Sequence, residues 1–278
     1  MIDPDIVGKK LEPFVFEHTW KDVVLYALGI GAQIDELPFL YENHPEGLKV
    51  FPSFGTILSG HFFFKALVPL KINLARFIHG EHILTLHRSI PANARTRTEG
   101  GIVSMYDKGK AALITFQANT STDDGEVLCT NEYVIYYQGG GGFGGDPGPK
   151  QEPMEYPEGV EPDFSVSYLI PENQAVLYRL NGDINPLHID PESAQSSGFE
   201  NPIFHGLGTF GYATRAILYS LCEGDVERFK EIKVRFTGAV YPGETLVTEG
   251  WKQEEGRYLI QARTERGTVL SQAMTRIV

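Results

Sequence analysis

The stretch Tyr178-Arg179-Leu180-Asn181-Gly182-Asp183 can be laid on an earlier stretch, Tyr26-Ala27-Leu28-Gly29-Ile30-Gly31. Two further matches follow in the same order: Phe51–Thr56 with Phe204–Thr209, and His79–Leu84 with Pro242–Val247. Each match alone is weak, but their common order indicates an internal duplication. A duplicated chain of 278 residues predicts two similar units, each large enough for a core.

Each half contains a region with the signature of antiparallel strands. Apolar residues recur in short runs, and turn residues such as Asp124-Gly125 and Glu255-Gly256 separate the runs. The predicted strands lie at 83–88, 101–106, 111–120, 127–137, 232–236, 244–251, 257–264 and 269–277. The strongest helix prediction is Gly206 to Leu221, where apolar residues recur at helical spacing. Each half is therefore predicted to be an α+β unit, a helix followed by an antiparallel sheet.

A glycine- and proline-rich segment separates the halves. Residues 139–149 are Gly-Gly-Gly-Gly-Phe-Gly-Gly-Asp-Pro-Gly-Pro, and an acidic, proline-containing stretch continues to about Pro162. Such a composition cannot bury enough apolar area to order itself alone and is typical of a linker. We predict an N-terminal unit at 1–138, a linker at 139–162 and a C-terminal unit at 163–278.

The composition excludes several classes of function. The formal net charge is −12, whereas a general nucleic-acid binder needs a basic face. No apolar run approaches the roughly 20 residues that cross a bilayer, so membrane insertion is not expected. The N-terminus is acidic where a secretory signal would be basic. The two cysteines, Cys129 and Cys222, are too few for a disulfide framework and favour a reduced, intracellular setting.

The residues best suited to chemistry gather in the turn that follows Gly182. Asp183, Asn185 and His188 place a carboxylate, an amide and an imidazole within six residues. Alone, Asp183 would more often cap a turn, and His188 would more often be a structural histidine. On one turn fixed by Pro186, an acid and a base can divide two proton transfers, so we predict a catalytic pair.

The start of the predicted helix, His205-Gly206-Leu207-Gly208, is a second candidate. One interpretation is a helix start with glycines for close packing. The functional interpretation is that N–H groups at a helix N-terminus are unpaired and carry partial positive charge. Gly206 would let a ligand oxygen come close, so its N–H is predicted to stabilise negative charge there.

A metal site is an alternative for the same region. His188, Asp190 and His205 have the ligand types of a two-histidine, one-carboxylate iron site. However, Asp190-Pro191-Glu192-Ser193 more simply predicts the N-cap and first turn of a short helix. We therefore expect no metal.

Basic residues form two small groups. Lys233 and Arg235 alternate with apolar residues, so both lie on one face of a predicted strand, and Lys108 and Lys110 lie near a turn. The simplest interpretation of each group is a solvated surface. Gathered round one cleft, they would suit phosphates.

Three motifs carry a resemblance to a known family: Leu180–His188, Pro202–Gly206 and Val240–Glu244. They resemble the MaoC-like (R)-specific 2-enoyl-CoA hydratases, called hydratase 2. The similarity continues through Ile78–Glu81, Asp107–Gly109 and the Gly-rich linker, so nearly the whole chain resembles the hydratase of the peroxisomal multifunctional β-oxidation enzyme type 2. It implies a double hot-dog fold, in which two helix-and-sheet repeats pair side by side. It also implies reversible hydration of trans-2-enoyl-CoA to (3R)-3-hydroxyacyl-CoA, without metal or redox cofactor.

The resemblance implies a role for each matching residue. Asp183 and His188 match the family's acid/base pair, Asn185 matches the amide that helps to place the water, and Gly206 matches the oxyanion donor. The predicted contacts to the CoA thioester and acyl chain are His79, Gly80, Lys108, Ile184, Pro186, Leu187 and Phe236, and we add Lys233 and Arg235.

The first half lacks this set. Gly31 stands at the position matched to Asp183, and Gln33 at the position matched to Asn185, so the first half is predicted to be non-catalytic. The resemblance implies that it accommodates the acyl chain and CoA instead. It further implies a homodimer, dehydrogenase domains joined in a full-length protein, and a peroxisomal location. The chain ends Thr275-Arg276-Ile277-Val278 and shows no peroxisomal tripeptide. This ending is what we expect of a domain excised from a longer protein that carries the tripeptide.

Two rival functions fit the same fold. A hot-dog acyl-CoA thioesterase would release free CoA thiol, and a non-catalytic acyl-CoA binding module would bind without reaction. The set of Asp183, Asn185 and His188 disfavours both, because binding alone needs no acid/base pair.

Overall fold

A single ten-stranded antiparallel sheet organises the chain, in the order β1-β3-β4-β5-β2-β7-β10-β9-β8-β6. The computed structural model describes residues 3–67 and 76–278. The strands are β1 Phe14–His18, β2 Phe77–Leu86, β3 Ala94–Asp107, β4 Ala111–Thr122, β5 Val127–Gln138, β6 Phe164–Leu169, β7 Phe229–Phe236, β8 Thr245–Glu254, β9 Arg257–Thr264 and β10 Gly267–Ile277. The α-helices are α1 Trp20–Gly29, α2 Gly55–Leu67, α3 Gln174–Tyr178, α4 Pro191–Ser196 and α5 Gly206–Cys222.

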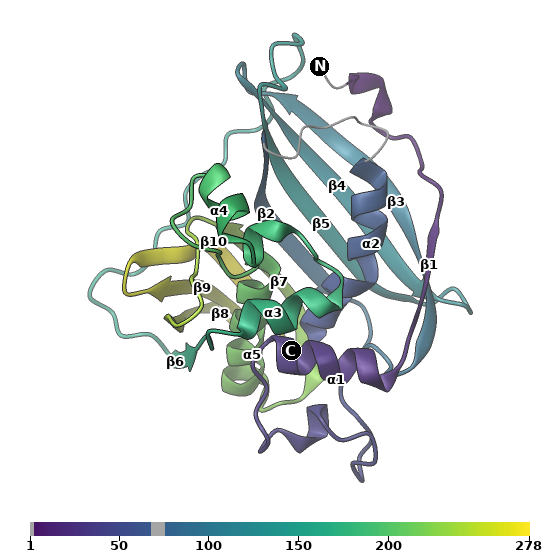
Figure 1. Ribbon diagram of the computed structural model, residues 1–278, viewed down its shortest axis with the longest axis vertical. Helices are drawn as coiled ribbons and strands as arrows, with labels where there is room; N and C mark the ends of the chain where they lie inside the picture. Colours follow the sequence, from purple (N-terminus) through teal and green to yellow (C-terminus); the bar gives the residue numbers. More distant parts are fainter. Residues whose placement is uncertain (1–2, 68–75) are drawn as a thin grey trace.

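The strand order confirms the predicted duplication. From one edge to the centre the order is β1-β3-β4-β5-β2, and from the other edge to the centre it is β6-β8-β9-β10-β7. The strands of the two halves therefore occupy equivalent places about an approximate twofold axis. β2 and β7 pair at the centre, from Glu81 opposite Arg235 to Thr85 opposite Glu231, and this ladder joins the halves into one sheet. Figure 1 shows α2 lying along the face of β3, β4 and β5, and α5 contacts the strands of the second half.

The predicted α+β character is confirmed in each half. The helix expected at Gly206 to Leu221 is α5, and most of its residues are buried beneath the sheet. Each of the eight predicted strands is present. β2 begins at Phe77, earlier than expected, because a β-bulge between His79 and Glu81 interrupts the alternation of side chains. The short edge strands β1 and β6 were not predicted. None of the helices in the described residues has the length and hydrophobicity needed to cross a membrane.

The strand order corrects one of the three sequence matches. His79–Leu84 lies in β2, whose equivalent in the second half is β7. Pro242–Val247 instead leads into β8, the equivalent of β3. The shared Gly-Glu pair was therefore a coincidence of composition.

A second correction moves the register of the duplicated turn by one residue. Gly31 and Gly182 both adopt a positive φ, 79° and 117°, at the end of a helical segment. A Cβ at Gly31 would lie 2.4 Å from the Tyr212 hydroxyl, and one at Gly182 would lie 3.0 Å from the His61 ring. Since Tyr212 and His61 stand at the same position in α5 and α2, these contacts are reciprocal, and Gly31 corresponds to Gly182.

The corrected register identifies what replaces the chemistry-bearing residues in the first half. Ala32, Leu37 and Phe54 stand where the second half has Asp183, His188 and His205. Phe54 and His205 agree with this register, since each stands directly before the first residue of the long helix of its half, Gly55 of α2 and Gly206 of α5. The first half therefore still lacks the carboxylate and both imidazoles.

The segment between the halves has no helix or strand in residues 139–163, yet hydrogen bonds fasten it to both repeats. The Asp107 carboxylate accepts the N–H groups of Gly142 and Gly144 at 2.9 and 2.8 Å. Further along, the Tyr156 hydroxyl donates to the carbonyl of Ile260 at 2.9 Å. The glycine-rich run is thus ordered by its neighbours, because it has no core of its own.

A buried ion pair also ties the halves together. Arg215 of α5 donates through Nε to Glu36 at 2.8 Å, and its Nη2 binds the other carboxylate oxygen. The guanidinium lies 4.1 Å from the ring centroid of Tyr168 in β6. The side chains of Arg215 and Glu36 are only 6% and 9% exposed, so the charges depend on each other.

Glu36→Leu should lower the free energy of unfolding by about 3–5 kcal/mol, because it leaves the Arg215 guanidinium buried without a partner. The double variant Glu36→Leu/Arg215→Leu should recover part of this loss. Urea unfolding followed by circular dichroism measures both. As a control, Glu46→Leu breaks the exposed pair with Lys49 and should cost less than about 1 kcal/mol. A Glu36→Leu protein as stable as the wild type would contradict the expectation.

Candidate active site

The turn at 182–188 is held in place by its own polar side chains. Gly182, with φ 117°, ends the short 3₁₀ helix Arg179–Asn181 that follows α3. The Asp183 carboxylate accepts the N–H of Asn185 at 3.2 Å, and the Asn185 side chain accepts the N–H of Leu187 at 3.1 Å. Asn185 thereby caps the 3₁₀ helix Pro186–His188. These local bonds fix the direction in which Asp183 and His188 leave the backbone.

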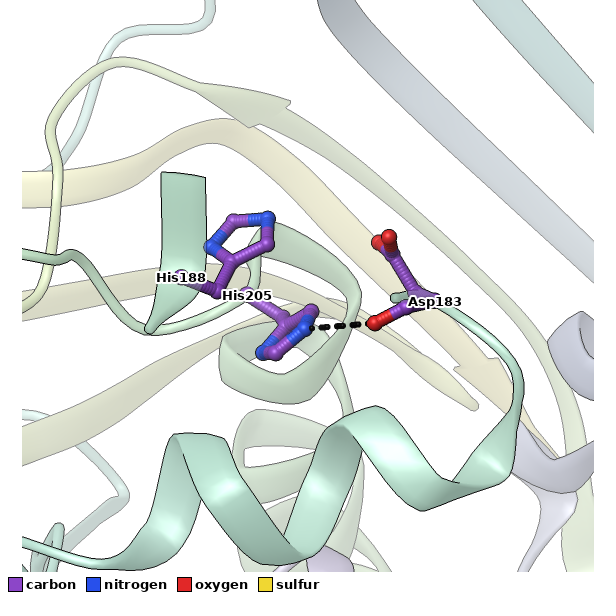
Figure 2. Close-up of side chains that lie close together, drawn as sticks. All are labelled: Asp183, His188 and His205. Carbon is purple, nitrogen blue, oxygen red and sulfur yellow. Dashed lines mark hydrogen bonds between the residues drawn. The ribbon is translucent and has the colours of Figure 1, made fainter. Parts of the chain in front are cut away.

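Asp183, His188 and His205 form a compact cluster, in which one polar side-chain atom of each lies within 4.8 Å of the others. Figure 2 shows the Asp183 carboxylate and the His188 ring facing the same small volume, with the His205 ring below. The two imidazoles stack with their centroids 3.8 Å apart and an angle of 27° between planes. His205 comes from the N-cap of α5, so the cluster joins the turn to the central helix.

The hydrogen bond of His188 defines its tautomer. Its Nδ1 lies 2.9 Å from the carbonyl oxygen of Ile203, and a carbonyl can only accept. Nδ1 therefore carries the proton, and Nε2, on the side of Asp183 in Figure 2, is left as a proton acceptor. Burial lowers the pKa of His188 from its ordinary value, while the charge of Asp183 and the bond to Ile203 oppose the shift. At neutral pH His188 is thus an uncharged base.

His205 positions the other two residues. Its Nε2 donates to the backbone carbonyl of Asp183 at 3.1 Å, and its ring supports the face of His188. Burial, with the neighbouring His188, lowers the pKa of His205 to about 3, so it stays neutral. Its Nδ1 is buried and has no hydrogen-bond partner among the described residues. The sequence interpretation considered His205 only as an iron ligand and a helix start, and its place beside Gly206 was the signal that could have identified it.

The geometry disfavours the iron site considered from the sequence. The Asp190 carboxylate accepts the N–H groups of Glu192 and Ser193, both at 3.2 Å, and so caps α4 as the simpler interpretation predicted. A metal binds an imidazole in the ring plane at about 2.0–2.1 Å. The rings of His188 and His205 instead stack, with 27° between their planes, which differs from two imidazoles that approach a common ion in their ring planes.

Gly206 lies next to the cluster as the first residue of α5, so its N–H has no acceptor within the helix. A Cβ there would meet nothing closer than the Phe236 ring at 3.5 Å, an ordinary contact. By contrast, a Cβ at Gly208 or Gly211 would clash with neighbouring side chains at 2.4 and 2.3 Å. Packing explains the glycines at 208 and 211, and it does not explain the one at 206.

His79 and Phe236, two of the predicted substrate contacts, lie together on the helix side of the sheet near Gly206. Their ring centroids are 5.0 Å apart, and the bulge at Gly80 turns His79 to the same side as His82. Burial lowers the pKa of His79 to about 4, so this ring is neutral. Lys108 lies in the turn beyond β3, at the end of the sheet where β2 begins, and its Nζ bonds to the carbonyl of Pro147.

The structure does not bring Lys233 and Arg235 to the cluster. Both form ion pairs with the buried carboxylate of Glu81. Their neighbours Ile232 and Val234 point to the helices, so the two cations lie on the opposite face of the sheet. The alternation in sequence correctly predicted that Lys233 and Arg235 share one face, but both cations are ion-paired to Glu81 there. Within the turn at 182–188, Ile184 is 68% exposed and so is available to a ligand.

Comparisons with known proteins identify relatives over both halves. Residues 16–139 match a family model described as the MFE-2 hydratase 2 N-terminal domain, and residues 153–274 match the MaoC like domain. A probable enoyl-CoA hydratase 2 of Dictyostelium discoideum is 39% identical over 94% of this chain and 90% of its own length. The peroxisomal multifunctional enzyme type 2 of Mus musculus is 40% identical over 89% of this chain, which spans 34% of that protein.

Solved structures give the same result for the fold. A MaoC-like dehydratase from Phytophthora capsici matches with a TM-score of 0.88 and 31% identity, covering 98% of this chain and 97% of that one. A Mycobacterium tuberculosis protein described as having a double hot-dog fold matches with a TM-score of 0.55 and 14% identity, covering 96% and 95% of the two chains. Together with the strand order, these matches confirm the predicted double hot-dog fold.

The pKa of His188 should lie below 6.5, and Asp183→Asn should lower it further, because the charge of Asp183 stabilises the protonated ring. Titration of the imidazole resonances by NMR measures both values. Asp190→Asn, which removes a nearby carboxylate while keeping a capping side chain, should leave the His188 titration unchanged. A rise in the His188 pKa on Asp183→Asn would rule out this arrangement.

Proposed function

This chain belongs to the MaoC-like enoyl-CoA hydratase 2 family, and we propose on that basis that it catalyses the reversible hydration of trans-2-enoyl-CoA to (3R)-3-hydroxyacyl-CoA in fatty-acid β-oxidation. One observation carries the proposal at the level of the site. A carboxylate and a neutral imidazole with a free Nε2 face one volume, beside an unpaired N–H at a helix N-terminus. The (3R) configuration is supported by the resemblance of Leu180–His188 to the (R)-specific enzymes.

The acid/base pair acts on one water molecule. Asp183 and Nε2 of His188 hold the water, and His188 accepts a proton as the water oxygen bonds to the β-carbon. The π electrons of the double bond move toward the thioester carbonyl, forming an enolate-like intermediate. The same pair then returns one proton to the α-carbon, so the elements of water are added and none is left over. The Asp183 carboxylate stabilises the imidazolium that exists between the two steps.

Gly206 supplies the complementary electrostatic group. Its N–H belongs to the first turn of α5, where the helix dipole adds partial positive charge. A thioester oxygen that approaches this N–H gains most stabilisation when it carries negative charge, which occurs in the enolate-like state. The missing Cβ matters because a methyl group there would occupy the approach of that oxygen.

The CoA portion is proposed to follow the sheet end beyond Gly206. Phe236 lies beside that glycine, His79 lies against Phe236, and Gly80 and Lys108 lie toward the same end of the sheet. Ile184, Pro186 and Leu187 lie in the same turn as Asp183 and His188 and are proposed to contact the substrate near the reacting carbons. Lys233 and Arg235 receive no such support, because both lie on the other face of the sheet, where they are ion-paired to Glu81.

The rival functions lack a comparable observation. A thioesterase would direct its water to the thioester carbonyl, whereas the donor at Gly206 and the pair at Asp183 and His188 suit a carbonyl oxygen and a more distant carbon. A binding module would have no need for the buried imidazoles, which cost stability.

The cellular location and the covalently joined domains are proposed from the names of the relatives. The mouse relative is a peroxisomal multifunctional enzyme, which supports a peroxisomal location and a covalent link to further enzyme domains in the full-length protein as proposals. The homodimer stays a prediction.

Asp183→Asn and His188→Gln should each lower kcat for crotonyl-CoA hydration by roughly 10²–10⁴-fold, because each removes one partner of the proton-transfer pair. Loss of absorbance of the conjugated thioester measures the rate, and chiral chromatography identifies the product. Asp190→Asn and His87→Gln make the same chemical changes outside the cluster and should keep near wild-type rates. Full activity in either cluster variant, or an (S) product, would refute the assignment.

Gly206→Ala should lower kcat/KM by about 10²–10³-fold without unfolding the protein, because the added methyl displaces the oxygen from its donor. The fold should tolerate the change, since the nearest side chain would be 3.5 Å away. Gly60→Ala adds a methyl to α2 with no heavy atom within 4 Å and is the matched control. Unchanged kinetics in folded Gly206→Ala would exclude this N–H as the oxyanion donor.

A further inference from the structure

We propose that His61, on α2 of the non-catalytic half, is a specificity-determining residue that contacts the acyl chain just beyond the β-carbon. The inference rests on the proposed function, because that function fixes where the reacting carbons lie. None of the predicted catalytic residues comes from the first half. The inference gives one side chain of that half a measurable effect on the preference for acyl chain length.

The reaction defines a direction through the site. The thioester oxygen lies at the N–H of Gly206, and the β-carbon lies where the water is held by Asp183 and His188. Carbons beyond the β-carbon therefore leave the cluster on the side away from Gly206. Gly182 directly precedes Asp183, so its backbone borders this volume, and the acyl chain is proposed to pass this glycine.

His61 lies directly against Gly182. A Cβ built on that glycine would be 3.0 Å from Cε1 and 3.1 Å from Nε2 of the His61 ring. No side chain therefore separates the imidazole from the backbone that carries Asp183. The positive φ of Gly182 and the closeness of His61 both require glycine here, which keeps this side of the turn open.

The surroundings of His61 are apolar and aromatic. Its ring centroid lies 5.7 Å from that of Phe14 and 5.5 Å from that of Phe16, both on β1. Phe64, three residues later on the same helix face, is 47% exposed. A half-buried imidazole in such a wall offers an acyl chain a flat surface, but its nitrogens lose hydration when hydrocarbon covers them.

The twofold relation supplies an internal comparison. Tyr212 holds the equivalent place on α5, and its ring packs against Gly31, which has no aspartate after it. Tyr212 is only 1% exposed, whereas His61 is partly exposed. The contact of Tyr212 with Gly31 is thus closed to solvent. The equivalent contact of His61 with Gly182, beside Asp183, is accessible.

Two substitutions at His61 should change chain-length preference in opposite directions. His61→Phe keeps the flat surface and removes the cost of dehydrating the imidazole, so it should raise the preference for a ten-carbon over a four-carbon chain by about threefold to tenfold. His61→Ala removes the surface and should lower the same preference by roughly tenfold. Tyr212→Phe, the twofold-related control, should leave the preference unchanged.

The preference is measured in two ways, so that binding and reaction are separated. Isothermal titration calorimetry gives the ratio of Kd values for butanoyl-CoA and decanoyl-CoA, which are saturated and cannot be hydrated. Steady-state kinetics gives the ratio of kcat/KM for crotonyl-CoA and trans-2-decenoyl-CoA. Circular dichroism verifies that each variant is folded.

The outcomes distinguish the two proposals. Opposite shifts in both ratios support the role of His61. If folded His61→Phe and His61→Ala both keep the wild-type Kd ratio while the enzyme hydrates, the inference is overturned and the proposed function stands. If the Kd ratio moves as expected but wild-type protein hydrates neither enoyl-CoA, the proposed function fails and the acyl contact of His61 stands.

Discussion

The pairing of β2 with β7 is the interaction on which the rest of the structure depends. It makes one continuous sheet from two copies of the same unit, from Glu81 opposite Arg235 to Thr85 opposite Glu231. The ladder sets His79 of the first half beside Phe236 of the second, and Phe236 lies against the start of α5. Glu81, Lys233 and Arg235 form ion pairs across the same ladder on its outer face. The turn proposed to be catalytic belongs to one repeat, but its surroundings exist only because the two repeats are held in this register.

The two repeats have kept their backbone turn and diverged in polarity. Gly31 and Gly182 end equivalent helical segments with positive φ, and each supports a ring from the central helix of the other half. After them the first half has Ala32, Leu37 and Phe54 at positions where the second half has one carboxylate and two imidazoles. Buried imidazoles without full hydrogen bonding cost stability, as the unpartnered Nδ1 of His205 illustrates. A protein that needs one active site therefore gains stability by making the other position apolar, which matches the divergence seen here.

The sequence was sufficient where a signal was local and regular. The spacing in α5, the alternation in the long strands and the gathering of Asp183 and His188 on one turn each depend on near neighbours in the chain. It was insufficient where partners come from distant segments. His205 acts through a bond to the carbonyl of Asp183 and a stack on His188, and neither leaves a sequence pattern. Alternation put Lys233 and Arg235 on one face, but only the packing of Val234 against the helices shows which face it is.

The chemistry open to the cluster depends on which imidazole nitrogens already donate hydrogen bonds to backbone carbonyls. His188 donates Nδ1 to Ile203 and His205 donates Nε2 to Asp183, so both rings are oriented by carbonyl oxygens that cannot take part in proton transfer. Burial lowers the pKa of each imidazole, and the second ring, at about 3, cannot compete for the proton that His188 is proposed to accept. One acceptor nitrogen and one carboxylate then remain for one water molecule. Because the same two groups can take a proton from water and return it to carbon, the site is suited to reversible addition, with the direction set by the concentrations of substrate and product.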